Sequence, residues 1–340
     1  MAGLEVWAAG ANAPGLATGL AQRAEHDGYD GISFGDTQCA AADPYVGLTA
    51  AAVATTRLKL AVGVTNPVTR HPAVTACAIA SVHLESGGRA VLGIGRGDSA
   101  VSKIGLRGAS VAQLERYLAQ VQRYLSGEVV EVDGYDSTLP WLRDLPLPKV
   151  PVDVAATGPA VIAVGARLAE RVTFNVGADP ARITRAVSLA RQSGAAPALS
   201  LGAYLNVAPH HDRTVARRLV RGVVATYARF SGMPGHPVDA LDPADAGVIS
   251  EIAKRYDMAR HGRSEAAHTE VIDDAFIDRF GVAGPPEYCV ERLAGLVGLG
   301  LDRLAIVGPA HDGPPELAAE STRLLVEEVI PAVRHAVRTG

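Results

Sequence analysis

The chain is poor in cysteine, in aromatic residues and in net charge. Its three cysteines, Cys39, Cys77 and Cys289, lie far apart without CxxC spacing, which argues against a disulfide framework or a zinc site and favours a reducing cytoplasm. A formal net charge of −4 and the lack of a basic stripe argue against a nucleic-acid surface. No run of about 18 apolar residues is present, so we expect no membrane span. A strand within a few residues of Met1 leaves no room for a signal peptide, so we expect a cytoplasmic protein.

One predicted buried strand is followed directly by several polar side chains. Residues 58–64 form a valine-rich apolar run broken only by Lys59, as expected for a strand covered on both faces. Thr65, Asn66 and Arg70 follow with two prolines, where the strand must open into a loop. A Pro-rich turn alone would give the same pattern. In barrels of alternating strands and helices, however, the carboxyl ends of the strands form the active-site face.

The same strand-then-helix unit recurs along the chain, which predicts an α/β fold of the (β/α)8 TIM-barrel class rather than a doubly wound sheet. The expected strands are residues 5–9, 30–34, 58–64, 89–94, 152–156, 171–175, 199–207 and 302–307. The expected helices are residues 14–26, 44–55, 72–84, 111–125, 159–169, 180–192, 212–230 and 315–337.

Length agrees with a barrel that carries insertions. A (β/α)8 barrel needs roughly 250 residues, and this chain has 340 residues. We expect a single domain over residues 1–340, with the surplus in two long connections at about 126–151 and 231–281. The second contains a charged helical stretch around residues 252–263. Connections of that length are candidates for lids or substrate walls.

Four of the strands end in polar or glycine-rich segments that should meet at one mouth of the barrel. Asp36 follows the second strand, Thr65 and Asn66 end the third, residues 95–98 follow the fourth, and Thr157 follows the fifth. A lone carboxylate such as Asp36 at such a place serves as a helix cap about as often as it serves a site.

Two glycine-containing segments differ in what they predict. The run of residues 93–97 has GxGxG spacing, not GxGxxG, and no acidic residue ends the next strand, so it is not a dinucleotide fingerprint. The turn Ala156-Thr157-Gly158 opens a helix, and free backbone N–H groups at a helix start favour an anion. We therefore expect a phosphate at that turn.

Several of these segments together resemble the bacterial-luciferase-like monooxygenase superfamily, especially its coenzyme F420-dependent branch, which is methylene-tetrahydromethanopterin reductase-like. The resemblance covers nearly the whole chain in order. It is carried by residues 28–36, 63–67, 69–72, 92–98, 155–159, 280–287 and 300–303.

The resemblance implies how a cofactor would be held. The family's third strand carries a non-prolyl cis peptide bond in a bulge behind the central flavin ring, and the matching bond here is Gly63–Val64. The deazaflavin F420 moves hydride and does not readily activate oxygen. The residues implied as cofactor-binding are Asp36, Gly63, Val64, Asn66, Gly97, Ala156, Thr157, Gly158 and Asn175.

Departures from the family shape the expected chemistry. Thr37 follows Asp36 where the dehydrogenases place histidine, and a threonine is no general base near neutral pH. Alcohol oxidation is therefore disfavoured, and we expect reduction of a C=N or activated C=C bond of a small organic substrate. Asp98 is the candidate proton donor, because a carboxylate that faces an apolar pocket has a raised pKa.

Two other functions remain open. An FMN-dependent monooxygenase of the same superfamily would use reduced FMN and oxygen, and a flavin or F420 reductase would supply the cofactor as a partner. A flavin-binding protein without turnover is the other alternative, although such members usually lose the fourth-strand loop, which is intact here. The Ala- and Val-rich helices at 44–55 and 72–84 favour a homodimer that packs on them, as in relatives.

Overall fold

The computed structural model describes residues 3–10, 14–233, 243–310 and 312–339. A parallel barrel runs through these segments, and the order of its strands is β9-β11-β1-β2-β3-β4-β7-β8, closed by pairing of β8 with β9. This confirms the predicted fold class. The barrel strands are β1 (Glu5–Gly10), β2 (Gly31–Phe34), β3 (Lys59–Thr65), β4 (Ala90–Ile94), β7 (Val152–Ala156), β8 (Arg171–Phe174), β9 (Ser200–Pro209) and β11 (Arg303–Val307).

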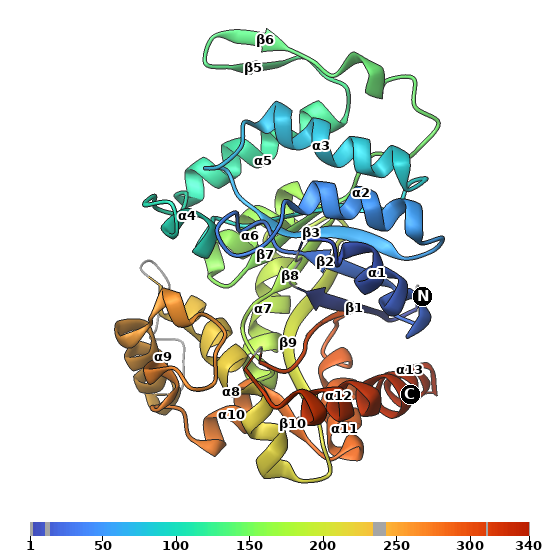
Figure 1. Cartoon of the computed structure of the whole chain (residues 1–340). Helices are drawn as coiled ribbons and strands as arrows, with labels where there is room; N and C mark the ends of the chain where they lie inside the picture. Colours follow the sequence, from blue (N-terminus) through green and yellow to red (C-terminus); the bar gives the residue numbers. More distant parts are fainter. Residues whose placement is uncertain (1–2, 11–13, 234–242, 311, 340) are drawn as a thin grey trace.

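Helices surround the barrel (Figure 1). Several begin with proline at the first position, where the missing N–H costs no hydrogen bond, and in α2 (Pro44–Ala54) and α7 (Pro180–Gln192) the preceding aspartate caps the helix. Asp43 accepts from two backbone N–H groups at the start of α2, and Asp179 accepts from one in α7. The outer helices are α1 (Ala17–His26), α2 (Pro44–Ala54), α3 (Pro72–Glu85), α5 (Val111–Leu125), α6 (Pro159–Leu168), α7 (Pro180–Gln192), α11 (Pro286–Val297), α12 (Pro315–Leu324) and α13 (Ile330–Thr339), the last two joined by a π-helical turn at Leu325–Val329.

The second long connection starts earlier than expected. The helix α8 (Arg213–Arg229) does not lead back to the next barrel strand, because α11 is the helix that directly precedes β11. The whole segment from α8 through α9 (Pro243–Arg255) and α10 (Asp274–Phe280) is therefore one insertion after β9, and residues 234–242 of it lie outside the described residues. It ends in β10 (Val282–Gly284), which pairs with the end of β9. The predicted helical stretch at 252–263 was wrong beyond Arg255, where α9 ends.

The first long connection is not a lid. It forms a hairpin of β5 (Val130–Val132) and β6 (Tyr135–Ser137), which Figure 1 shows beyond α3 and α5. Its end packs near the amino ends of the strands, since Lys149 Nζ lies 2.8 Å from Glu170 just before β8. A connection from a helix to the next strand lies opposite the carboxyl ends of the strands, so it cannot cover the predicted mouth.

Charged side chains lie at the amino end of the barrel interior. The Glu5 carboxylate at the start of β1 accepts from Arg171 at 2.7 Å and from the Trp7 indole at 2.9 Å, and it pairs with Lys59. Burial alone would raise the pKa of Glu5, but the two cations hold it at about 2. No helix in the described part of the chain is long and apolar enough to cross a membrane.

Candidate active site at the carboxyl ends of the strands

A bulge interrupts β3 at the predicted position. The register between β3 and β4 shifts between Val62 and Thr65, and the Gly63–Val64 peptide bond is cis. Gly93 on β4 makes room for the bulge, because a Cβ there would lie 2.0 Å from the Val62 carbonyl oxygen. The cis bond implied by the resemblance is therefore present in the structure.

Asp36 is fixed between β3 and α2. Its side chain is 1 % exposed, and its Oδ2 accepts from the Thr65 hydroxyl at 2.8 Å. Arg70 Nε lies 3.6 Å from the same oxygen, while the Arg70 guanidinium stacks over the Tyr45 ring at 4.7 Å. Because Asp43, and not Asp36, caps α2, the helix-cap alternative for Asp36 is excluded.

One atom of the Asn66 amide is hydrogen-bonded, and the other has no partner among the described residues. Its Oδ1 accepts from the backbone N–H of Val68 and of Thr69, which shapes the loop after β3. Its Nδ2 is buried and has no partner among the described residues. Gly97 lies against it with φ +89°, and a Cβ at Gly97 would lie 3.1 Å from the Asn66 Cβ. The predicted residues Asn66 and Gly97 are thus neighbours.

Asn175 follows β8 in the same layer as the end of β7. Its backbone N–H donates to the Ala156 carbonyl at 2.8 Å. Its Oδ1 is buried, and nothing in the described chain donates to it. Asn66 and Asn175 therefore offer a buried donor and a buried acceptor without partners, which native proteins rarely leave unsatisfied.

The turn at residues 156–158 opens α6 as predicted. Gly158 is the N-cap residue of that helix, with Pro159 at its first position, and no described side chain caps it. The first backbone N–H groups of α6 are therefore available to an anion, with the positive end of the helix dipole behind them. Thr157 is half-buried beside this helix start.

Asp98 lies at the start of the short helix α4 (Ser99–Ser102), yet its side chain makes no cap hydrogen bond. It forms a two-oxygen ion pair with Arg229, the last residue of α8, with Arg229 Nη1 2.6 Å from Oδ2. The apolar surroundings expected for Asp98 were therefore wrong, since a guanidinium lies against both of its carboxylate oxygens. Its role as proton donor stays a prediction.

Sequence reasoning missed a cluster that the second insertion adds beside Asp98. The Arg229 guanidinium stacks 4.3 Å above the Tyr256 ring, and the Tyr256 hydroxyl lies 2.8 Å from His261 Nδ1. The buried His268 ring also stacks on the Tyr256 ring, with the two ring centroids 4.2 Å apart. No motif marks these residues in the sequence. Their only signal was an unusually long connection that carries histidines.

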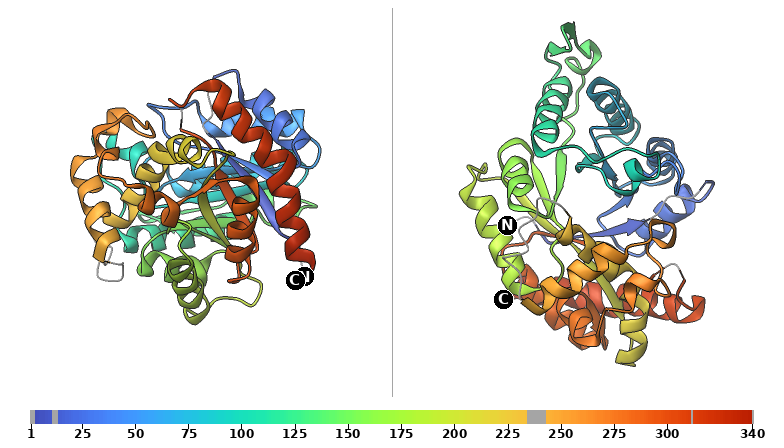
Figure 2. Two further views of the ribbon diagram at one scale, coloured as in Figure 1. Left: turned by 90° about the horizontal axis from the view of Figure 1, so that it is seen from below. Right: turned by 90° about the vertical axis from the view of Figure 1, so that its left-hand side faces the viewer.

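The figures agree with these contacts. In Figure 1, α4 and α9 lie on the same side of the barrel, and the right-hand view of Figure 2 looks onto that side. The Lys103 ammonium, just after α4, donates to the Met258 carbonyl at 3.4 Å. The second insertion thus contacts the loop that follows β4. Among the described residues, no group of His, Cys, Asp and Glu side chains is placed to hold a metal ion.

Comparison with known proteins now identifies the family. Residues 5–303 match the family described as luciferase-like monooxygenase. The chain belongs to this family. One similar protein, 5,10-methylenetetrahydromethanopterin reductase of Methanolobus tindarius, is 27% identical over 320 residues, which cover 91% of this chain and 94% of that protein. An F420-dependent glucose-6-phosphate dehydrogenase of Microbacterium testaceum is 25% identical over 296 residues, covering 82% of this chain and 80% of that protein.

A solved structure gives the same arrangement of strands and helices. The coenzyme F420-dependent tetrahydromethanopterin reductase from Methanopyrus kandleri matches with a TM-score of 0.74 at 23% identity, covering 97% of this chain and 99% of that chain. At this identity the likeness establishes the luciferase-like barrel fold.

Proposed function

We propose that this protein is an oxidoreductase that exchanges hydride between coenzyme F420 and a small organic substrate. The observation that carries the proposal is the pair of buried, unpartnered groups at the mouth, Asn66 Nδ2 and Asn175 Oδ1. A deazaflavin presents both acceptors and donors at its polar ring edge, so the two amides fit such a ring. The F420-dependent relatives support the same cofactor.

Each predicted cofactor-binding residue receives a role in this proposal. Asp36 is held by Thr65 and Arg70 just after β2, and we assign it to the wall of the cofactor site. Gly63 and Val64 form the bulge on which the ring rests, and Gly97 admits the ring close to the backbone. When bound, F420 supplies a carbon centre that accepts or releases hydride. The protein positions the ring, excludes water and moves the accompanying proton.

The cofactor tail is proposed to lie at the start of α6. Ala156 and Thr157 lead into the uncapped helix, so its free N–H groups would hold the phosphate. A leucine in place of Gly158 should therefore weaken F420 binding by about tenfold or more, a loss of about 1.4 kcal/mol. Binding of a deazaflavin without the phosphate should be unchanged. Equal weakening of both ligands would instead indicate a general distortion.

The residues that follow the barrel strands favour reduction of a C=N or activated C=C bond. Thr37 after β2 supplies no base, and its hydroxyl lies only 3.5 Å from that of Ser99. An FMN-dependent monooxygenase is the second candidate, supported by the family description itself. In either case we propose that a separate reductase in the cytoplasm supplies the reduced cofactor.

A substitution pair tests the proposed ring contacts. Asn66→Asp keeps the Oδ1 that accepts from Val68 and Thr69, and it replaces the free donor by an acceptor. Asn175→Leu removes the free acceptor. Each change should weaken F420 binding by about 5- to 100-fold, the effect of losing one buried hydrogen bond. Unchanged dissociation constants for both variants, with unchanged urea unfolding, would show that the ring binds elsewhere.

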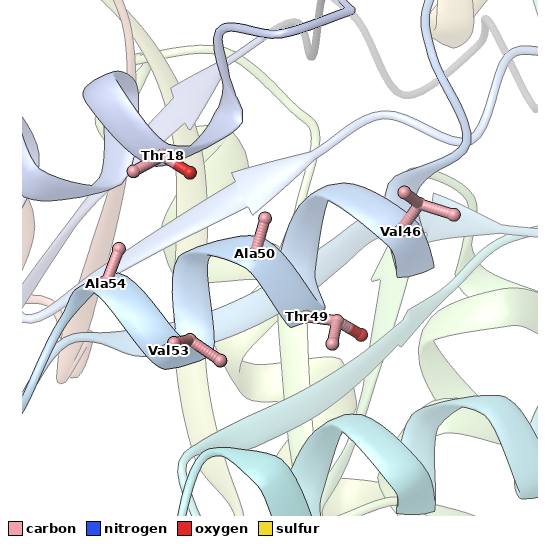
Figure 3. Close-up of a pocket in the computed structure, with 6 residues that line it drawn as sticks. All are labelled: Thr18, Val46, Thr49, Ala50, Val53 and Ala54. Carbon is pink, nitrogen blue, oxygen red and sulfur yellow. The ribbon is translucent and has the colours of Figure 1, made fainter.

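Assembly as a homodimer is also proposed. Figure 3 shows a shallow, mainly apolar groove formed by Thr18 on α1 together with residues of α2. Val46 and Val53 on α2 are 73% and 76% exposed, and Val74 on α3 is 52% exposed. Aliphatic side chains clustered in this way on neighbouring helices of a single barrel domain favour a partner subunit.

A further inference from the structure

The strand registers define layers of side chains inside the barrel. Trp7 on β1 lies level with Ala305 on β11, and Ala305 lies level with Tyr204 on β9. These side chains pack together with Ala61 of β3 and Val91 of β4, which only the barrel interior allows. Because side chains on a strand alternate between its two faces, the residues two positions further along β1, β9 and β11 also point inward. They form the next layer toward the carboxyl ends of the strands.

Asn206 is the polar side chain that these strands contribute to the next layer. The registers place it level with Val307, and they place Val307 level with Ala9. Asn206 is 2% exposed, and its Nδ2 has no partner among the described residues. A buried N–H group without an acceptor is destabilising, and native proteins rarely retain one. The Asn206 amide therefore indicates a ligand.

The residues proposed to hold F420 come from another part of the barrel. They lie on or just after β2, β3, β4, β7 and β8, which are consecutive in the sheet. Asn206 lies on β9, the strand that pairs with β8 ahead of Asn175. Asn206 Nδ2 and Asn175 Oδ1 do not bond to each other, although one is a donor and the other an acceptor. The Asn206 amide is therefore available to a molecule that lies beside the cofactor.

Apolar and aromatic side chains surround this part of the mouth. Ala9 and Val307 pack against the apolar cluster that α8 forms in the second insertion. The Tyr227 ring of α8 has its centroid 6.0 Å from that of the Tyr204 ring and 6.1 Å from that of the Phe230 ring. Burial raises the pKa of Tyr204 and of Tyr227, so both phenols are uncharged near neutral pH. Such walls favour an uncharged, flat molecule.

We infer that Asn206 is a catalytic residue that binds the carbonyl oxygen of the substrate. The inference rests on the proposed F420 function and deepens it by naming the substrate class, an uncharged α,β-unsaturated carbonyl compound. An amide N–H donates to a carbonyl oxygen, whereas it repels a cationic C=N group. Because the layer neighbours Ala9 and Val307 are apolar, they offer no partner to a charged substrate group. Of the two proposed bond types, Asn206 therefore favours the activated C=C bond.

The proposed step balances as a conjugate reduction. The substrate β-carbon takes a hydride from reduced F420, so a C–H bond of the deazaflavin breaks and a new one forms on the substrate. The π electron pair moves toward the carbonyl oxygen, where Asn206 Nδ2–H stabilises the developing negative charge. The α-carbon then takes a proton, directly from water or through Asp98, and the carbonyl re-forms. Reduced F420 loses its second hydrogen to water as a proton, which leaves oxidised F420 and the saturated carbonyl compound.

Infrared spectra of a bound ketone test the contact without turnover. The probe is 4-phenylbutan-2-one with 13C in its carbonyl group, added to the full chain with and without oxidised F420. We expect a lower C=O stretching frequency in the wild-type complex than in the Asn206→Leu complex, because only the wild type donates a hydrogen bond to the oxygen. The same frequency in both proteins, or no binding of the probe, would overturn the inference.

Turnover is tested with reduced F420 and three uncharged enones, namely 2-cyclohexen-1-one, carvone and 4-phenylbut-3-en-2-one. The wild type should reduce at least one of them. Asn206→Leu should lower kcat by about 10²-fold or more, the effect of losing one oxyanion donor, with an unchanged Kd for F420. Cinnamate, which carries a carboxylate in place of the methyl ketone of the third enone, should not be reduced. Reduction of cinnamate at the rate of the enones would contradict the uncharged substrate class.

Urea unfolding separates this role from a structural one. An asparagine with a structural partner would lose stability as leucine, whereas removal of an unpartnered buried donor should leave the unfolding midpoint unchanged or raised. A lowered midpoint for Asn206→Leu would therefore count against the inference. The matched control is Ser321→Ala on the outer helix α12, because Ser321 is 0% exposed and its hydroxyl is also unpartnered among the described residues. Ser321→Ala should keep the wild-type kcat.

The outcomes separate the two proposals. If F420 does not bind to the wild type, the proposed function fails, while the infrared measurement still decides whether Asn206 binds a carbonyl group. If F420 binds but no enone is reduced, or if Asn206→Leu keeps the wild-type kcat, the proposed function stands and the inference is overturned.

Discussion

Arg229 and Asp98 lie 131 positions apart in the chain, and the Arg229 guanidinium donates to both carboxylate oxygens of Asp98. Their side chains are only 12% and 14% exposed. This ion pair joins the end of α8 to the loop after β4, on the side of the barrel where the predicted site residues gather. Through this ion pair the second insertion forms part of the predicted site.

Asp98→Asn should therefore affect stability as well as chemistry. Removing one partner of a nearly buried pair leaves the Arg229 charge uncompensated, which should cost about 2–4 kcal/mol in urea unfolding. The matched control Glu115→Gln breaks a pair with Arg167 in which both side chains are 43% exposed, and it should cost less than about 1 kcal/mol.

The same variant decides the catalytic role of Asp98. If Asp98 donates the proton, turnover should fall by about 10²–10⁴-fold with little change in cofactor affinity. Full turnover in Asp98→Asn would show that Asp98 is not the proton donor and has only a structural role, in its ion pair with Arg229.

Gly97→Ala should weaken F420 binding by about tenfold, a loss of about 1.4 kcal/mol. Two effects combine there, a φ of +89° and a Cβ only 3.1 Å from the Asn66 Cβ. The control Gly194→Ala has φ +79° with nothing near its Cβ. Both variants should lose about 1 kcal/mol of stability from the backbone alone. Only Gly97→Ala should raise the Kd for F420. Equal F420 affinity in the two variants would show that Gly97 does not lie against the cofactor.

The proposed dimer is tested on α2. Val53→Asp places a charge in the exposed apolar groove of Figure 3 and should give monomers in light scattering at micromolar concentration. Tyr135→Asp is the control, because Tyr135 is 81% exposed on the β5–β6 hairpin, outside the groove. A wild-type chain that is monomeric under the same conditions contradicts the dimer.

Glu5→Gln should destabilise the barrel in a pH-dependent way. The pKa of Glu5 falls from 4.5 to about 2 on folding, so its ionised form stabilises the fold above pH 4.5. That contribution, about 3 kcal/mol at most, is lost as the pH falls toward 2. The stability difference between wild type and variant should therefore be largest near pH 7 and small at pH 2. A constant difference would contradict the role of Arg171 and Lys59.

Local patterns were sufficient to predict the barrel. Each apolar run of β character, such as residues 58–64, lies within two residues of its observed strand, because burial on both faces requires continuous apolar sequence. The polar residues at strand ends, such as Asp36 and Asn66, were found for the same reason, since the fold brings all carboxyl ends together.

The contacts made by the second insertion could not be predicted. Whether Asp98 meets a guanidinium or an apolar wall depends on where Arg229 lies, and no local pattern relates residues so far apart in the chain. Likewise, the contacts of Tyr256 with Arg229, His261 and His268 form within a folded connection that has no periodicity or motif. The length of the first connection suggested a lid. Because that connection runs from a helix to the next strand, it lies at the amino ends of the strands and cannot cover the mouth.

Titration of the purified apoprotein with oxidised F420 and, separately, with FMN tests the central claim most directly. The account predicts saturable F420 binding at least about tenfold tighter than FMN binding, a difference of about 1.4 kcal/mol. Tighter binding of FMN than of F420, or no binding of either, would contradict the assignment of this mouth to a deazaflavin.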